Sequence, residues 1–107
     1  ELGAVPIDRL ATLPHGRMVL VGGSVTHRQM PATAQGTVFI NLEDESGLLN
    51  VICSKGTWAR YRRVARLNPA LLIRGKLERY EGMVSVVAAR IEPLTIPTGA
   101  PNSRDFR

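Results

Sequence analysis

Five segments of this sequence alternate apolar and polar residues with a period of two, and a single segment between them has a helical period. The alternating segments are 17–27, 37–43, 48–53 and the two parts of 70–94 on either side of a turn at 80–82. Such alternation is typical of strands that bury one face and expose the other. Residues 54–69, SKGTWARYRRVARLNP, instead place their apolar side chains on one helical stripe. The sequence therefore predicts five strands, with one short helix between the third and the fourth.

This order of elements is the layout of the OB-fold, a small five-stranded Greek-key barrel. The first predicted strand has Val19, Val21 and Val25 on one face and a Gly22-Gly23 pair in its middle. Glycines inside a strand mark a bulge or a sharp bend, and the first strand of such a barrel must bend in order to pair on both sides. We therefore predict an all-β OB-fold barrel with one short helix. A five-stranded open sheet with a packed helix is the alternative.

Three consecutive acidic residues, 43–45, lie between the second and third predicted strands. Clustered carboxylates can bind Mg²⁺, but Glu43 and Asp44 are neighbours at a strand end and their side chains point in different directions. Asp44 and Ser46 can bond to the local backbone, and Gly47 is expected to take a positive φ. We therefore predict a hairpin turn here, with no metal site. A second tight turn is predicted at residues 80–82.

The sequence predicts one domain, residues 17–94, between two different ends. Residues 1–16 are expected to form a linker or a short helix that ends at Pro14 and Gly16. Residues 95–107 are rich in Pro, Gly, Ser and Asn and are predicted to form a flexible C-terminal tail. No apolar run reaches the roughly 20 residues that a membrane helix needs, and the single cysteine cannot form an internal disulfide. A cytoplasmic location is expected.

The charge balance points to a polyanionic partner, because 14 Lys and Arg residues outnumber nine Asp and Glu residues. OB-folds bind oligonucleotides on the face around strands two and three and in the adjoining loops. Single strands require a positive groove for phosphates and aromatic faces for stacked bases. Phe39 is the best stacking candidate and Tyr80 the second. The predicted nucleic-acid-binding residues are Arg28, Phe39, Asn41, Arg74, Lys76, Arg79 and Tyr80.

The predicted helix has two different faces. Trp58, Tyr61, Val64 and Ala65 form an apolar stripe that is expected to pack against the barrel. The opposite side is either a solvated face or a docking surface for an acidic partner, and its residues are Arg60, Arg62, Arg63 and Arg66. The sequence contains neither a G-x-x-x-x-G-K-[ST] phosphate loop nor a G-x-S-x-G nucleophile motif. No catalytic residue and no cofactor are predicted within the chain.

Several motifs carry a resemblance to a known family. These are THRQ-PAT at 26–33, F-NLEDE-G--NV at 39–51, W-RYRR-AR at 58–66 and the ending SRDFR. Together they closely resemble the carboxyl-terminal region of bacterial error-prone DNA polymerases, damage-inducible relatives of the DNA polymerase III alpha subunit. The likeness spans residues 13–107, and the ending suggests that Arg107 is the carboxyl terminus of the parent chain.

The resemblance implies an accessory OB domain of a C-family DNA polymerase that copies damaged template during DNA repair and the SOS response. The catalytic carboxylates and Mg²⁺ of the parent enzyme would lie in an upstream palm domain, so the fragment itself is not expected to be an enzyme. The implied partners are single-stranded template DNA, a Y-family-like adaptor of the mutagenic complex and, indirectly, the sliding clamp. Binding to single-stranded DNA is expected to be weak and sensitive to salt.

Two other functions remain open. In the first, the barrel is a scaffold and the chain is a protein-docking module for partners in the mutagenic complex. In the second, the chain is an anticodon-binding OB domain of a tRNA synthetase, which shares the F--L-D--G pattern of the second predicted strand. A preference for RNA over DNA would support the second function.

Overall fold

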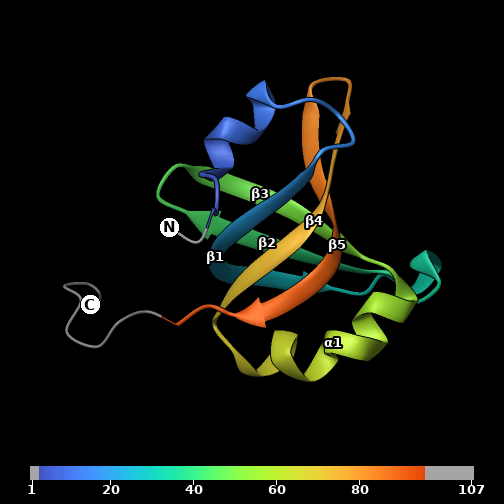
Figure 1. The fold of residues 1–107 in the computed structure, drawn as a ribbon. Helices are drawn as coiled ribbons and strands as arrows, with labels where there is room; N and C mark the ends of the chain where they lie inside the picture. The colour runs from blue at the N-terminus through green and yellow to red at the C-terminus, as the bar shows by residue number, and fades with distance from the viewer. Residues whose placement is uncertain (1–2, 96–107) are drawn as a thin grey trace.

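The computed structural model describes residues 3–95, which form a closed five-stranded barrel (Figure 1). The elements are η1 (Ile7–Thr12), β1 (Met18–Gln29), η2 (Ala32–Ala34), β2 (Val38–Asp44), β3 (Gly47–Cys53), α1 (Lys55–Leu67), β4 (Ala70–Tyr80) and β5 (Met83–Pro93). The strand order is β1-β2-β3-β5-β4, and β3 and β5 are the parallel neighbours. The helix lies between β3 and β4, as the sequence predicts, and the OB-fold is confirmed over the open sheet.

β1 is long enough to pair with two neighbours. Its residues 18–24 pair with β4 and its residues 24–29 pair with β2. β1 curls around the barrel (Figure 1), and its partner changes from β4 to β2 at Ser24, directly after Gly22-Gly23. A Cβ atom added at Gly23 would lie 2.6 Å from the carbonyl oxygen of Glu43. Only glycine permits this approach of the two backbones. A bulge follows between Val25 and His27, so the predicted bend and bulge both occur in this strand.

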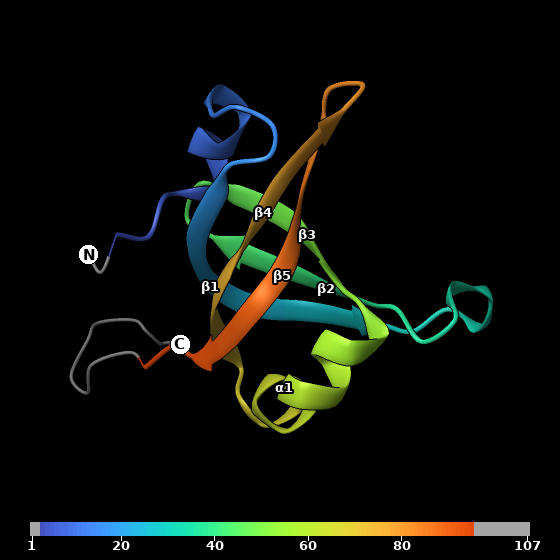
Figure 2. The ribbon, with the colours of Figure 1, turned by 45° about the vertical axis from the view of Figure 1, so that its right-hand side comes forward.

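Two helical segments close the two ends of the barrel (Figure 2). The 3-10 helix η1 inserts Ile7 and Leu10 into the core at one end. At the other end α1 buries Ala65, while Trp58 and Tyr61 pack partly buried against the same core. The predicted apolar stripe of the helix is therefore confirmed. Part of the segment 1–16 is also core, because Leu10 is fully buried.

The acidic run at residues 43–45 forms the predicted hairpin turn. One carboxylate oxygen of Asp44, Oδ1, accepts hydrogen bonds from the N–H groups of Ser46 at 2.8 Å and Gly47 at 3.0 Å. The expectation of a positive φ at Gly47 was wrong, because Gly47 begins β3 and these hydrogen bonds shape the turn instead. The positive φ angles occur in the other hairpin turn, at Glu81 (53°) and Gly82 (80°), as a type I′ turn requires.

Polar side chains cap both ends of α1. Ser54 caps α1, since its Oγ accepts a hydrogen bond from the Thr57 N–H at 3.2 Å. Asn68 ends the helix and donates from Nδ2 to the Val64 carbonyl oxygen at 2.9 Å. Within residues 3–95, no helix is both long and apolar enough to cross a membrane. The predicted tail, apart from Thr95, lies outside the described residues.

Candidate nucleic-acid interface

A row of side chains crosses the outer wall of the barrel from β2 to β4. The strand pairing places Phe39 beside Ile52, Ile52 beside Val87, and Val87 beside Lys76. Residues paired in this way project from the same side of a sheet, and the inward positions on either side of Phe39, Val38 and Ile40, are buried. The row therefore faces solvent. Adjacent strands lie about 4.8 Å apart, so the three steps cover about 14 Å.

A second row lies beside the first and carries hydrogen-bonding groups. Asn41 pairs with Asn50, and Asn50 pairs with Ser85. All three side chains are half-buried, and their amide and hydroxyl groups can both donate and accept hydrogen bonds. We call these two rows the strand face: Phe39, Asn41, Asn50, Ile52, Lys76, Ser85 and Val87. On β4 the second row ends at Glu78, which pairs with Ser85. The face therefore combines apolar surface and hydrogen-bonding groups with one cation, Lys76, and a carboxylate at its β4 edge, and the apolar row that ends at Lys76 has the chemistry that an unpaired nucleotide requires.

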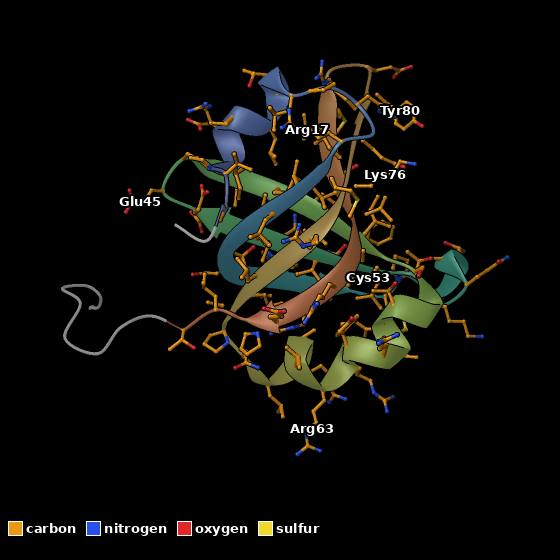
Figure 3. All side chains as sticks on the ribbon, in the orientation of Figure 1. Arg17, Glu45, Cys53, Arg63, Lys76 and Tyr80 are labelled. Atoms are coloured by element: carbon orange, nitrogen blue, oxygen red, sulfur yellow. The ribbon has the colours of Figure 1, made fainter. Side chains whose placement is uncertain are left out.

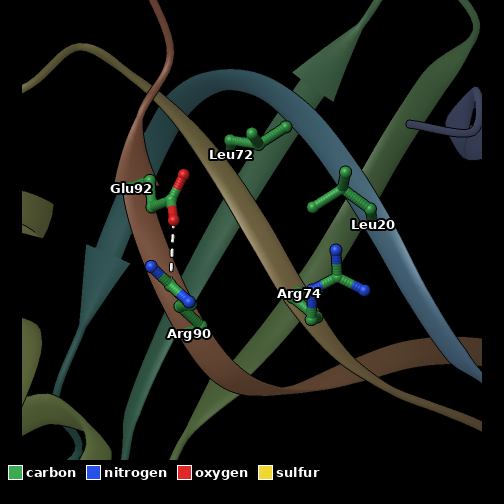
Figure 4. Close-up of a pocket in the computed structure, with 5 residues that line it drawn as sticks. All are labelled: Leu20, Leu72, Arg74, Arg90 and Glu92. Carbon is green, nitrogen blue, oxygen red and sulfur yellow. Dashed lines mark ion pairs between the residues drawn. The ribbon is translucent and has the colours of Figure 1, made fainter. Parts of the chain in front are cut away.

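Arg74 lies one outward position along β4 from Lys76, outside the two rows of the strand face. Arg74 and Lys76 are both exposed on the outside of β4, but Lys76 meets the strand face through Val87, whereas Arg74 pairs with Leu20 and Arg90. A shallow pocket of about 250 Å³ opens here (Figure 4), lined by Leu20, Leu72, Arg74, Arg90 and Glu92. Arg90 and Glu92 form an ion pair across it, with 2.8 Å between Nε and Oε2.

Two of the predicted arginines already have backbone partners. Arg28 donates from Nε to the carbonyl oxygen of Ala65 at 2.9 Å and from Nη2 to that of Asn68 at 3.2 Å. It therefore joins the end of β1 to the last turn of α1. Arg79 donates from Nη2 to the carbonyl oxygen of Leu13 in the N-terminal segment. These contacts direct both guanidinium groups toward the chain itself.

Tyr80 stands at the rim of the interface, at the end of β4. Its side chain is 64% exposed, and its ring meets the His15 ring edge-on with 5.4 Å between centroids. Figure 3 shows Tyr80 and Lys76 on the same side of β4. The structure thus brings Phe39, Asn41 and Lys76 together, with Tyr80 at the rim. Arg74 shares the outward side of β4 with Lys76 and Tyr80, whereas Arg28 and Arg79 are directed toward backbone carbonyls.

Comparison with known proteins gives the family. A family model described as an OB-fold nucleic acid binding domain, tRNA_anti-codon, matches residues 19–94. The chain belongs to this OB-fold family. The OB domain is also 54% identical to the error-prone DNA polymerase of Mycobacterium tuberculosis (strain ATCC 25618 / H37Rv) over 106 residues, 99% of this chain and 10% of that protein. The error-prone DNA polymerase of Nocardia farcinica is 54% identical over 107 residues, 100% of this chain and 9% of that protein.

These relatives confirm the resemblance to error-prone DNA polymerases that the sequence motifs carry. The OB domain spans about a tenth of the length of the curated relatives that it matches. Among solved structures, asparaginyl-tRNA synthetase from Pyrococcus horikoshii complexed with asparaginyl-adenylate aligns with a TM-score of 0.73 and 15% identity. That alignment covers 94% of this chain and 24% of the synthetase chain, and it supports the fold alone.

Sequence reasoning missed four members of the strand face of this OB domain: Asn50, Ile52, Ser85 and Val87. The alternation in residues 48–53 carries a signal for two of them, because Leu49 and Val51 are the inward positions and Asn50 and Ile52 must face outward. The other two come from β5. Their place beside β3 follows from a parallel pairing between strands distant in sequence, which no local pattern reveals.

Proposed function

We propose that this OB domain holds single-stranded template DNA for an error-prone DNA polymerase, and that it binds the strand weakly through the strand face. The observation that carries the proposal is the row in which Phe39 lies beside Ile52 and Val87 and which ends at Lys76. A base can stack on Phe39 over an apolar floor while Lys76 neutralises a phosphate. One cation on the face predicts modest affinity that falls with salt.

The similarity to error-prone polymerases supports the wider role. In that role the parent enzyme carries out translesion synthesis in DNA repair and the SOS response, in the cytoplasm. Its catalytic carboxylates and Mg²⁺ would lie outside these residues. A Y-family-like adaptor and, through it, the sliding clamp would be its partners. The names of the relatives support the polymerase part of this proposal.

Titration of a fluorescent oligo-dT with the 107-residue chain tests the proposal at low and moderate salt. Loss of one stacked base costs about 1–3 kcal/mol, so Phe39→Ala should weaken binding about tenfold. Lys76→Ala should reduce the slope of log K against log salt by about 0.7. Arg9→Ala is the control, because this exposed arginine lies on η1 at the far end of β2 and should leave both quantities unchanged.

Two results would redirect the proposal. Absence of any anisotropy change at high micromolar protein and low salt would favour the protein-docking module. Tighter binding of oligo-U than of oligo-dT would favour an anticodon-binding type of domain, because the 2′-hydroxyl distinguishes RNA from DNA.

A further inference from the structure

The outer side of α1 is a basic surface of its own. The helix runs from Lys55 to Leu67 and contains no Asp or Glu. Its cations on the side away from the barrel form what we call the α1 basic face: Lys55, Arg62, Arg63 and Arg66. All four are exposed, and Figure 3 shows Arg63 pointing away from the barrel. Within residues 3–95, the ion pair between Arg90 and Glu92 involves none of them.

This concentration of charge works against the helix. Arg62 and Arg66 are four residues apart and Arg63 and Arg66 are three apart, so like charges adjoin on successive turns and repel one another. Acidic residues instead gather at the other end of β3, in the turn that holds Glu43 and Glu45. The two ends of this strand are about 20 Å apart. An approaching polyanion would therefore be steered toward α1.

The chemistry of the α1 basic face favours phosphate over an acidic protein. Stable protein interfaces have a core of buried apolar and aromatic anchors. The aromatic residues of α1, Trp58 and Tyr61, already pack against the barrel, and Leu67 at the last position is the exposed large apolar residue of the helix. Guanidinium groups match phosphate oxygens with two parallel hydrogen bonds. A face of arginines without anchors therefore suits a sugar-phosphate backbone.

The same lack of aromatic surface favours a duplex over a single strand at this face. Unpaired bases require a stacking platform, whereas a duplex stacks its own bases and presents phosphates outward. From Lys55 to Arg66 the helix rises about 16 Å, which is close to five base pairs at 3.4 Å each. The strand face begins nearby, since Ile52 lies two residues before the cap of α1 at Ser54.

We propose that the α1 basic face binds the phosphate backbone of duplex DNA next to the strand face, so that the domain spans a junction between duplex and single-stranded DNA. The proposed duplex contact depends only on α1, whereas the proposed binding of a junction also rests on the proposed function of the strand face. The contact involves phosphates only, so it is independent of base sequence.

The test compares two charge-matched double variants of the 107-residue chain. Arg62→Gln/Arg66→Gln removes two cations from the α1 basic face, and Arg9→Gln/Arg17→Gln removes two exposed cations from the opposite end of the barrel. The probes are a blunt 25-base-pair duplex, an oligo-dT of equal length and a junction of the two. Since all four residues are exposed, thermal unfolding should show that both variants fold.

The proposal predicts that the helix variant loses about tenfold in duplex affinity and that its salt slope falls by about 2, while its affinity for oligo-dT stays unchanged. The control variant should bind the duplex like the wild type. Phe39→Ala should show the reverse pattern, and the wild type should prefer the junction to either single probe.

Three results would overturn the proposal. Duplex binding by the helix variant equal to that of the control would remove α1 from the contact. Loss of oligo-dT binding in the helix variant would show that α1 extends the single-strand path. Binding of poly-glutamate but of no duplex by the wild type, lost in the helix variant, would assign α1 to an acidic protein. If Phe39→Ala binds every probe like the wild type, the proposed function of the strand face fails. The duplex affinity of the helix variant still tests separately whether α1 contacts the duplex.

Discussion

The carboxylate of Asp44 accepts a hydrogen bond from the backbone N–H of Ile7, with 2.9 Å between Oδ2 and N. These residues are 37 positions apart, and the bond fastens the start of η1 to the turn between β2 and β3. Burial acts to raise the pKa of Asp44, but hydrogen bonds from the Ser46 side chain and from the N–H groups of Ile7, Ser46 and Gly47 together lower it below its usual 3.8. The folded turn therefore stabilises the charged form of this carboxyl.

Replacement of Asp44 should destabilise the domain in a pH-dependent way. Asp44→Asn should lower the free energy of unfolding at pH 7 by about 1–2 kcal/mol, since hydrogen bonds to a charged acceptor are lost. The folded pKa is below the unfolded value, so this stabilisation exists above about pH 3.8 and disappears as the pH falls through the folded pKa. Urea unfolding at pH 7 and pH 3 measures the difference. Glu45→Gln, exposed in the same turn, is the control, and a wild-type advantage that persists unchanged at pH 3 would contradict the argument.

Arg28 should contribute to stability through the end of α1. Arg28→Ala removes the hydrogen bonds to the carbonyl oxygens of Ala65 and Asn68, and we expect a loss of about 1–3 kcal/mol in the free energy of unfolding. Arg28→Lys should recover little of it, because an ammonium group cannot reproduce the fork of a guanidinium. Urea denaturation checks both variants. Equal stability of Arg28→Ala and the wild type would show that these bonds contribute nothing in solution.

The fold could be predicted because its signals are local. Alternation of apolar residues marked each strand, one helical stripe marked α1, and Gly22-Gly23 marked the bend of β1. The turn at Asp44 could also be predicted, although the backbone conformation at Gly47 could not. Gly47 was expected to have a positive φ because glycine permits it, but the Asp44 side chain holds the turn without it.

The candidate interface was harder to predict from the sequence, because it depends on contacts between residues far apart in the chain. Alternation correctly placed Phe39, Asn41 and Lys76 on outward positions. It could not show that Arg28 and Arg79 hold backbone carbonyls on elements 37 and 66 residues away. A basic residue beside a loop has the same sequence pattern whether its side chain binds a ligand or stabilises the fold. The partners that decide between these roles are brought together only by the closed barrel.

The close approach of β1 and β2 predicts a strict requirement for glycine at position 23. A Cβ atom there would lie 2.6 Å from the carbonyl oxygen of Glu43, so the backbones must separate and Gly23→Ala should cost about 1–3 kcal/mol. Gly56→Ala is the matched control, because nothing lies within 4 Å of its Cβ position in α1 and alanine favours the helix by about 1 kcal/mol. Thermal melting should show opposite shifts, and a neutral Gly23→Ala would mean that the strands can separate freely.

Ionisation of the Cys53 thiol in the unfolded chain should lower the free energy of unfolding at alkaline pH. Its side chain is buried in the core, and burial raises the pKa of the thiol from 9.0 to about 11. An unfolded chain ionises this thiol first, so the stabilisation is complete below pH 9 and is lost as the pH rises toward 11. Cys53→Ala should be less stable than the wild type at pH 7.5, because it leaves a small cavity, and the difference should narrow by pH 10. Urea unfolding at the two pH values measures this difference in the free energy of unfolding.

The burial of Cys53 can be checked separately, because a thiol reagent should label the wild type only after unfolding. Rapid labelling of the folded chain would show that the thiol is accessible, and the predicted pH dependence would then fail with it.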